Sequence, residues 1–239
     1  MLHHTGQKRT YKHNLRLAAL LCLTAGLVNI SGLSGFFVLT TNVTGHAALF
    51  AQRLSHQEFQ AAIVVGLWML AFLLGAFTSG LYIKKIGSEH RNAYTFPIVC
   101  EMAILLLVGT FGHRYNKSTL ETEYFAGSLL FAMGMQNAMV TMISGSVVRT
   151  THLTGMFTDL GIDLSTYFSG EKKNETVNRK IILRLVIIFS FLAGGIMGGY
   201  LFVSFGYHTF YFPAGILFIV MFYDYFRFKA LKILNRLKS

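Results

Sequence analysis

Apolar residues occur along this chain in runs long enough to cross a lipid bilayer. Two of these runs are AAIVVGLWMLAFLLGAFTSGLYI (61–83) and IILRLVIIFSFLAGGIMGGYLFV (181–203). A helix needs about 20 consecutive, mostly apolar residues to span the hydrocarbon core, and both runs reach that length. The pattern therefore predicts an all-α polytopic membrane protein.

Six segments have the length and apolar character of full spans. They are residues 15–38, 59–83, 93–112, 123–148, 180–204 and 207–227. Two shorter apolar pieces, 46–54 and 156–168, are too short to cross a bilayer alone as helices. We expect each of these pieces to form a broken or re-entrant half-helix.

Each short piece follows directly on a polar, threonine-rich motif, TTNVTG at 40–45 and TTHLTG at 150–155. Backbone that leaves helical geometry inside a bilayer is tolerated only where protein or a water-filled cavity surrounds it. Threonine and asparagine supply side-chain hydrogen bonds there, and glycine allows another backbone or a ligand to approach closely. We expect Asn42 or Thr44 to cap the first half-helix and Thr154 to cap the second.

The two motifs belong to a longer internal repeat. Four landmarks recur in the same order at offsets of 108 to 119 residues. They are GLVN (26–29) with GMQN (134–137), the two threonine motifs, FLLGAFTSG (72–80) with FLAGGIMGG (191–199), and the two prolines, Pro97 and Pro213. We therefore divide the membrane domain into two repeats, residues 15–113 and 122–230.

Lysine and arginine gather at the ends of the spans, where they set the orientation of a membrane protein. They are frequent in the N-terminal tail (1–14), in the loops 84–92 and 169–180, and in the basic tail (231–239). Placing these segments in the cytoplasm gives six spans with both termini inside. Three spans per repeat then make the second repeat inverted, an architecture of secondary transporters. A rival topology, in which each half-helix crosses together with the extended segment before it, has eight crossings and fits the loop charges equally well.

Composition excludes several functional classes. The formal net charge of +11 comes largely from the loop cations and does not indicate a nucleic-acid surface. The only cysteines, Cys22 and Cys100, lie in apolar runs, so we expect neither a disulfide framework nor a metal site. The common catalytic motifs are missing from the sequence, and we expect neither enzymatic activity nor a cofactor.

Several of these motifs resemble the bacterial YoaK-like family of unknown function, also called DUF1275. The resemblance covers nearly the whole chain and rests on Ala25-Gly26 with Asn29, Thr44-Gly45, GMQN (134–137) and TTHLTGMFTDLG (150–161). It implies a multi-pass protein of the bacterial inner membrane with about six spans. It implies no particular activity, so function has to be argued from the residues.

The paired motifs form the candidate binding site. Inverted repeats bring two half-helix N-termini together near the membrane midplane, and their free N–H groups carry partial positive charge. We therefore expect a small secondary transporter or permease for a small polar or anionic solute. The expected binding residues are Thr40, Thr41, Asn42, Thr44 and Gly45 with Thr150, Thr151, His152, Thr154 and Gly155.

Residues outside the motifs are further candidates. The second-rank polar contacts are Asn29, Gln136, Asn137, Arg149 and Asp159. Glu101 lies within a predicted span, where an ionisable residue is costly and is a functional hypothesis by default, and we expect it to couple transport to a proton or ion. The alternative class is a non-transporting scaffold or accessory protein whose motifs only pack helices. The expected partners are the bilayer and an unidentified solute, and a homo-oligomer stays open.

Overall fold

The computed structural model describes residues 11–88, 90, 93–114, 119–169 and 175–222, and within these ranges every regular element is helical. The long helices are α1 (Tyr11–Phe36), α3 (Phe59–Ile86), α4 (Thr95–Phe111), α5 (Thr119–Ser144) and α7 (Glu175–Phe205). The two shorter helices are α2 (Val43–Ser55) and α6 (Leu153–Phe168), and η2 (Gly112–Arg114) and η3 (Gly206–Phe210) are short 3₁₀ helices. Residues 211–222 form a further helical segment.

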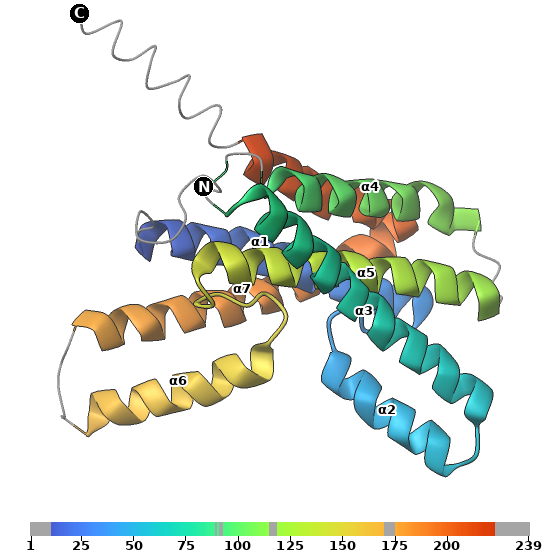
Figure 1. Cartoon of the computed structure of the whole chain (residues 1–239), viewed down its shortest axis with the longest axis horizontal. Coiled ribbons are helices and arrows are strands. Elements are labelled where there is room, and N and C mark those ends of the chain that lie inside the picture. The colour runs from blue at the N-terminus through green and yellow to red at the C-terminus, as the bar shows by residue number, and fades with distance from the viewer. Residues whose placement is uncertain (1–10, 89, 91–92, 115–118, 170–174, 223–239) are drawn as a thin grey trace, which may run out of the picture.

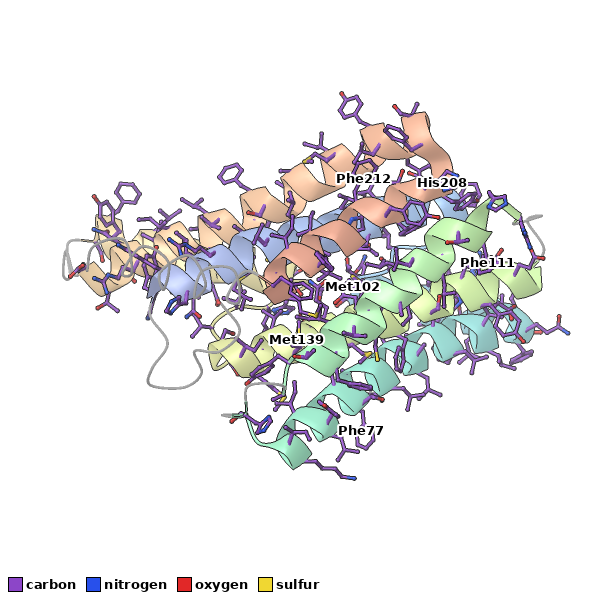
Figure 2. All side chains as sticks on the ribbon, turned by 90° about the horizontal axis from the view of Figure 1, so that it is seen from above. Phe77, Met102, Phe111, Met139, His208 and Phe212 are labelled. Atoms are coloured by element: carbon purple, nitrogen blue, oxygen red, sulfur yellow. The ribbon has the colours of Figure 1, made fainter. Side chains whose placement is uncertain are left out.

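Five stretches of the described chain are long and apolar enough to cross a membrane. They are Tyr11–Phe36, Phe59–Ile86, Thr95–Arg114, Glu121–Ser144 and Glu175–Phe222. The last stretch has 48 residues, which would measure about 72 Å as one helix, whereas the hydrocarbon core is about 30 Å thick. It is divided at η3, where Gly206 has a φ of +55° and the chain turns back (Figure 2). The predicted all-helical, membrane-spanning class is confirmed.

The helix ends differ by a few residues from the predicted spans. Helix α1 begins at Tyr11, so the last part of the predicted N-terminal tail is helical. Helix α5 ends at Ser144 rather than at residue 148, because Gly145 and Ser146 have positive φ angles that an α-helix does not continue through. The first ten residues and the basic tail (231–239) lie outside the described part of the chain.

Successive long helices run in alternating directions in Figure 1. Helices α1, α4 and α7 run from left to right, and α3 and α5 run from right to left. Helix α2 begins near the middle of the molecule and ends on the right, where α3 begins, while α6 begins near the middle and ends on the left, where α7 begins. Helix α2 therefore ends at the same end of the bundle as α1, and α6 ends at the same end as α5.

Glycines bring two helix pairs, α1 with α7 and α3 with α5, into the most extensive contacts of the described bundle. A Cβ atom added at any of four glycines would overlap a backbone carbonyl oxygen of the partner helix. These contacts are Gly26 with Phe191, Gly194 with Leu23, Gly75 with Phe131 and Gly134 with Phe72. Small residues allow membrane helices to pack backbone to backbone, which compensates for the weak hydrophobic drive between helices in lipid.

Candidate functional site

Two non-helical segments interrupt the bundle and lead into the half-helices. Residues 37–42 join α1 to α2, and residues 145–152 join α5 to α6. Phe37 opens the first segment with a φ of +60°, while Gly145 and Ser146 open the second with φ angles of +62° and +66°. A left-handed residue ends a helix abruptly. Both threonine motifs thus lie where a non-helical segment meets a half-helix.

The first motif caps its half-helix with a side chain, and the second motif does not. Asn42 is the N-cap residue of α2, and its Oδ1 accepts a hydrogen bond from the Gly45 N–H at 3.0 Å. His152 holds the equivalent position before α6, and its side chain makes no capping hydrogen bond. The prediction that Thr154 caps α6 is wrong, because Thr154 is already the second residue of that helix.

The glycine at the end of each motif makes room for the cap residue. A Cβ atom at Gly45 would lie 2.5 Å from Asn42 Nδ2, and one at Gly155 would overlap the ring of His152. The sequence suggested that these glycines admit another backbone or a ligand. The close contact in the structure is instead local, between the glycine and the residue three positions before it.

Side chains from α1 and α2 hold the first motif in place. The Thr41 N–H donates a buried hydrogen bond to Asn29 Oδ1 at 3.1 Å. His46 Nε2 donates to the Leu39 carbonyl oxygen at 2.7 Å, and its ring meets the edge of Trp68 on α3 with 5.7 Å between centroids. Asn29, a second-rank candidate, therefore supports the motif backbone directly.

Both threonine motifs line one cavity of about 660 Å³, a volume typical of small-molecule sites. The lining residues of the motif regions are Leu39, Thr41, Asn42, Val43, Thr44, Arg149, Thr151, His152, Leu153 and Thr154. Those on the long helices are Asn29, Phe72, Ala76, Asn137, Ala138, Thr141, Met142 and Phe191. Hydroxyl and amide groups can hydrogen-bond a polar solute here. Arg149, the one permanently charged side chain in this lining, can pair with an anion.

Most of the lining residues fall into pairs when the two halves of the sequence are aligned by the predicted repeat. The pairs are Asn29 with Asn137, Phe72 with Phe191, Leu39 with Arg149, Thr41 with Thr151, Asn42 with His152, Val43 with Leu153, and Thr44 with Thr154. Their offsets are 108 residues on α1 and α5, 110 in the motifs and 119 on α3 and α7. Arg149 introduces the one difference in formal charge among these pairs.

Several predicted residues do not line this cavity. They are Thr40, Gly45, Thr150, Gly155, Gln136, Asp159 and Glu101. Thr40 and Thr150 are fully buried, and their hydroxyl groups have no hydrogen-bond partner in the described part of the chain. Gln136 Nε2 donates to the Leu21 carbonyl oxygen at 2.8 Å and so ties α5 to α1. Gln136 therefore has a structural contact in place of the predicted solute contact.

The cavity also contains residues that sequence reasoning missed. Phe72 and Phe191 are the first residues of the paired landmarks FLLGAFTSG and FLAGGIMGG, and that pairing is the signal that could have placed both at the site. Thr141 lies one helical turn after Asn137 on α5, so helical spacing could have placed both on one face. The missed residues are walls contributed by long helices, where neither a landmark nor helical spacing shows which side chains face a cavity.

Glu101 lies on α4, apart from the lining of the cavity. Its side chain is fully buried, and neither carboxylate oxygen has a hydrogen-bond partner among the residues that the structure describes. The described cations form no ion pair with it either, so a structural pair with a basic residue does not account for Glu101 in the described part of the chain. An unpaired carboxylate is costly inside a membrane, and such a residue is a functional candidate.

Comparison with known proteins identifies relatives but no activity. A family model described as "Protein of unknown function (DUF1275)" matches residues 17–223. The chain is 26% identical over 184 residues to the UPF0700 transmembrane protein YoaK of Bacillus subtilis (strain 168), covering 76% of this chain and 80% of that relative. No solved structure matches the chain.

Proposed function

The chain belongs to the DUF1275 family, whose function is unknown, and we propose that it is a small secondary transporter or permease for a polar or anionic solute. The observation that carries this proposal is the cavity of about 660 Å³ lined by both threonine motifs. Non-helical backbone within a membrane domain is tolerated around a water-filled cavity, and transporters use it to build their binding sites.

The proposal includes two inverted repeats, residues 15–113 and 122–230, with six spans. Matched glycine contacts support it, because Gly26 meets Phe191 as Gly134 meets Phe72. The two glycines are 108 residues apart in the sequence, and the two phenylalanines are 119 apart. The chain directions also support it, because α1 and α5 run oppositely in Figure 1 and the two half-helices point toward opposite ends of the bundle. Inverted repeats of this kind allow one site to open alternately to either side of a membrane.

In this proposal the solute lies between the N-termini of α2 and α6. The threonine hydroxyls and the amides of Asn29 and Asn137 orient it, and Arg149 attracts its negative charge. The backbone contacts between α1 and α7 and between α3 and α5 are the surfaces along which the halves would rock. Glu101, buried away from the cavity, is the candidate for proton coupling.

The first test is a ligand screen on the purified protein. A solute that binds the folded cavity raises the temperature of unfolding, since binding to the folded state stabilises it by mass action. We expect Thr41→Ala and Thr151→Ala each to raise the dissociation constant of a solute found in the screen by about 2- to 12-fold, because each removes a hydrogen bond worth roughly 0.5–1.5 kcal/mol. Thr166→Ala is the matched control, because Thr166 is partly exposed on α6, lies outside the cavity and bonds its own helix.

The second test is uptake of that solute by proteoliposomes. Uptake that the two cavity variants reduce and the control leaves unchanged supports the transporter. A solute that binds without being taken up, or a screen with no positive solute, favours the non-transporting scaffold or accessory protein instead.

A further inference from the structure

A second cavity, of about 350 Å³, lies between the start of α6 and the facing side of α7. Its lining residues are Ser146, Val147, Arg149, His152, Gly155, Met156, Asp159, Lys180, Leu183 and Arg184. Three of these residues are permanent cations and one is an acid. Two of the predicted site residues that are missing from the larger cavity, Gly155 and Asp159, are found here.

The three cations are not equivalent. Arg184 pairs with Asp163, a buried residue of α6, and also lies 3.4 Å from Asp159. Its charge is therefore compensated by two carboxylates. Arg149 and Lys180 form no ion pair with any described acid. Among the described residues, the cavity thus has two cations without an acidic partner, next to the hydroxyl of Ser146 and the ring of His152.

The fold itself does not require this charge. The matched positions of the first half are Leu39 for Arg149, Leu49 for Asp159, Ala61 for Lys180 and Val65 for Arg184, all of them uncharged. The same arrangement of half-helix and long helix therefore forms without any ion at these places. Orientation of the chain also favours cations on one side of the membrane, so the asymmetry shows only that packing does not need them, and their binding role is argued from the cavity that they share.

The basic cavity also adjoins the larger one. Arg149 and His152 line both, so a group held by these two side chains is in reach of either. Lysine and arginine around a polar concavity are the usual partners of phosphate-type and carboxylate oxygens.

We propose that the basic cavity is a binding site for a phosphate-like oxyanion, held by Arg149 and Lys180 with Ser146 and His152 as hydrogen-bond donors. The oxyanion is either a free ion or the phosphate of a lipid headgroup. Where the oxyanion is a free ion, the inference deepens the proposed function by naming the class of solute, and it rests on that function only for the step from binding to transport.

The experiment measures the thermal unfolding midpoint of the full-length protein in nanodiscs. In phosphatidylcholine discs, inorganic phosphate or sulfate is titrated against sodium chloride at matched ionic strength. In a second arm without added oxyanion, phosphatidylglycerol replaces part of the phosphatidylcholine. The variants are Arg149→Gln, Lys180→Gln and the charge-conserving Lys180→Arg. The control Lys85→Gln removes an exposed cation at the end of α3, outside both cavities.

We expect an oxyanion to raise the midpoint of the wild type and of Lys85→Gln. The apparent dissociation constant should rise roughly tenfold in Arg149→Gln and in Lys180→Gln, since each variant loses a charge-assisted hydrogen bond. In Lys180→Arg it should stay close to the wild-type value. A cation-dependent shift in the phosphatidylglycerol arm alone also supports the site and identifies its ligand as a headgroup. Equal shifts in every variant, or no shift in either arm, would overturn the inference.

The same materials separate this inference from the proposed function. Oxyanion binding without uptake of any anion by proteoliposomes would refute the transporter and leave the binding site standing. Uptake of uncharged solutes by a protein that binds no oxyanion would refute the site and leave the transporter standing.

Discussion

The ion pair between α6 and α7 allows a quantitative prediction about stability. Arg184 pairs with Asp163, and the two side chains are 19% and 12% exposed. Asp159 lies 3.4 Å from the same guanidinium and is 45% exposed. On α7 itself, Arg179 pairs with Glu175, but these side chains are 53% and 77% exposed. Helix α7 therefore contributes one arginine to a shielded ion pair with α6 and another to an exposed pair within α7 itself.

The expected magnitudes follow from burial and from what remains after each substitution. Arg184→Gln leaves two carboxylates without their cation, and removing one partner of a buried pair costs about 3–5 kcal/mol. Asp163→Asn should cost less, about 1–2 kcal/mol, because Asp159 still lies beside the guanidinium and offsets part of its charge. Arg179→Gln should cost about 0.3–0.5 kcal/mol or less, as exposed pairs separated by one helical turn do.

The assay is reversible unfolding of the purified protein in mixed micelles, followed by circular dichroism as the fraction of denaturing detergent rises. The free energy of unfolding is compared among the wild type, Arg184→Gln, Asp163→Asn and Arg179→Gln. The double variant Arg184→Gln with Asp163→Asn should recover part of the loss, because it no longer buries a lone charge at Asp163. The reasoning is refuted if Arg184→Gln costs no more than Arg179→Gln.

Three further predictions concern the Asn42 cap of helix α2, the membrane topology and Glu101. Gly45→Ala should cost about 1 kcal/mol of unfolding free energy, because the added methyl group displaces the Asn42 cap. In an Asn42→Ala background the same substitution should be neutral or stabilising. Equal costs in both backgrounds would contradict the contact between Gly45 and the cap. Ser55→Cys, in a background without the two native cysteines, should react with an impermeant maleimide in intact cells if the chain has six spans, and only after permeabilisation if it has eight crossings. Glu101→Gln should leave the free energy of unfolding unchanged or higher and remove the proton dependence of uptake, whereas a large loss of stability would assign Glu101 a structural role.

The sequence by itself predicted the long helices and the two places where they break. Both depend on local patterns. Apolar length sets where a helix can cross a bilayer, and a threonine-rich motif ending in glycine marks where the backbone leaves helical geometry. The half-helices at Val43–Ser55 and Leu153–Phe168 begin three residues earlier than the predicted pieces, because the last three residues of each threonine motif already belong to the first helical turn.

Tertiary structure decided which of the predicted polar residues line the cavity. Thr41 lines the cavity, while its neighbour Thr40 is fully buried and does not line it. Asn137 lines the cavity, while Gln136 bonds the backbone of α1. Adjacent residues of similar chemistry thus have different environments. The direction of a side chain depends on the rotation of its helix or segment against a distant neighbour, and a local motif does not encode that rotation.

The basic cavity shows the same dependence on contacts between distant segments. Arg184 and Asp163 are 21 positions apart in the sequence and meet because α6 and α7 pack side by side. From the sequence, Lys180 is one of many cations near loops that orient the chain. Its position beside Arg149 in one cavity, which only the structure shows, indicates a candidate binding role as well. Sequence alone determined how much charge the chain carries and near which spans. The packing of α6 against α7 decided which charges are compensated, because electrostatic interaction depends on distance and burial in space.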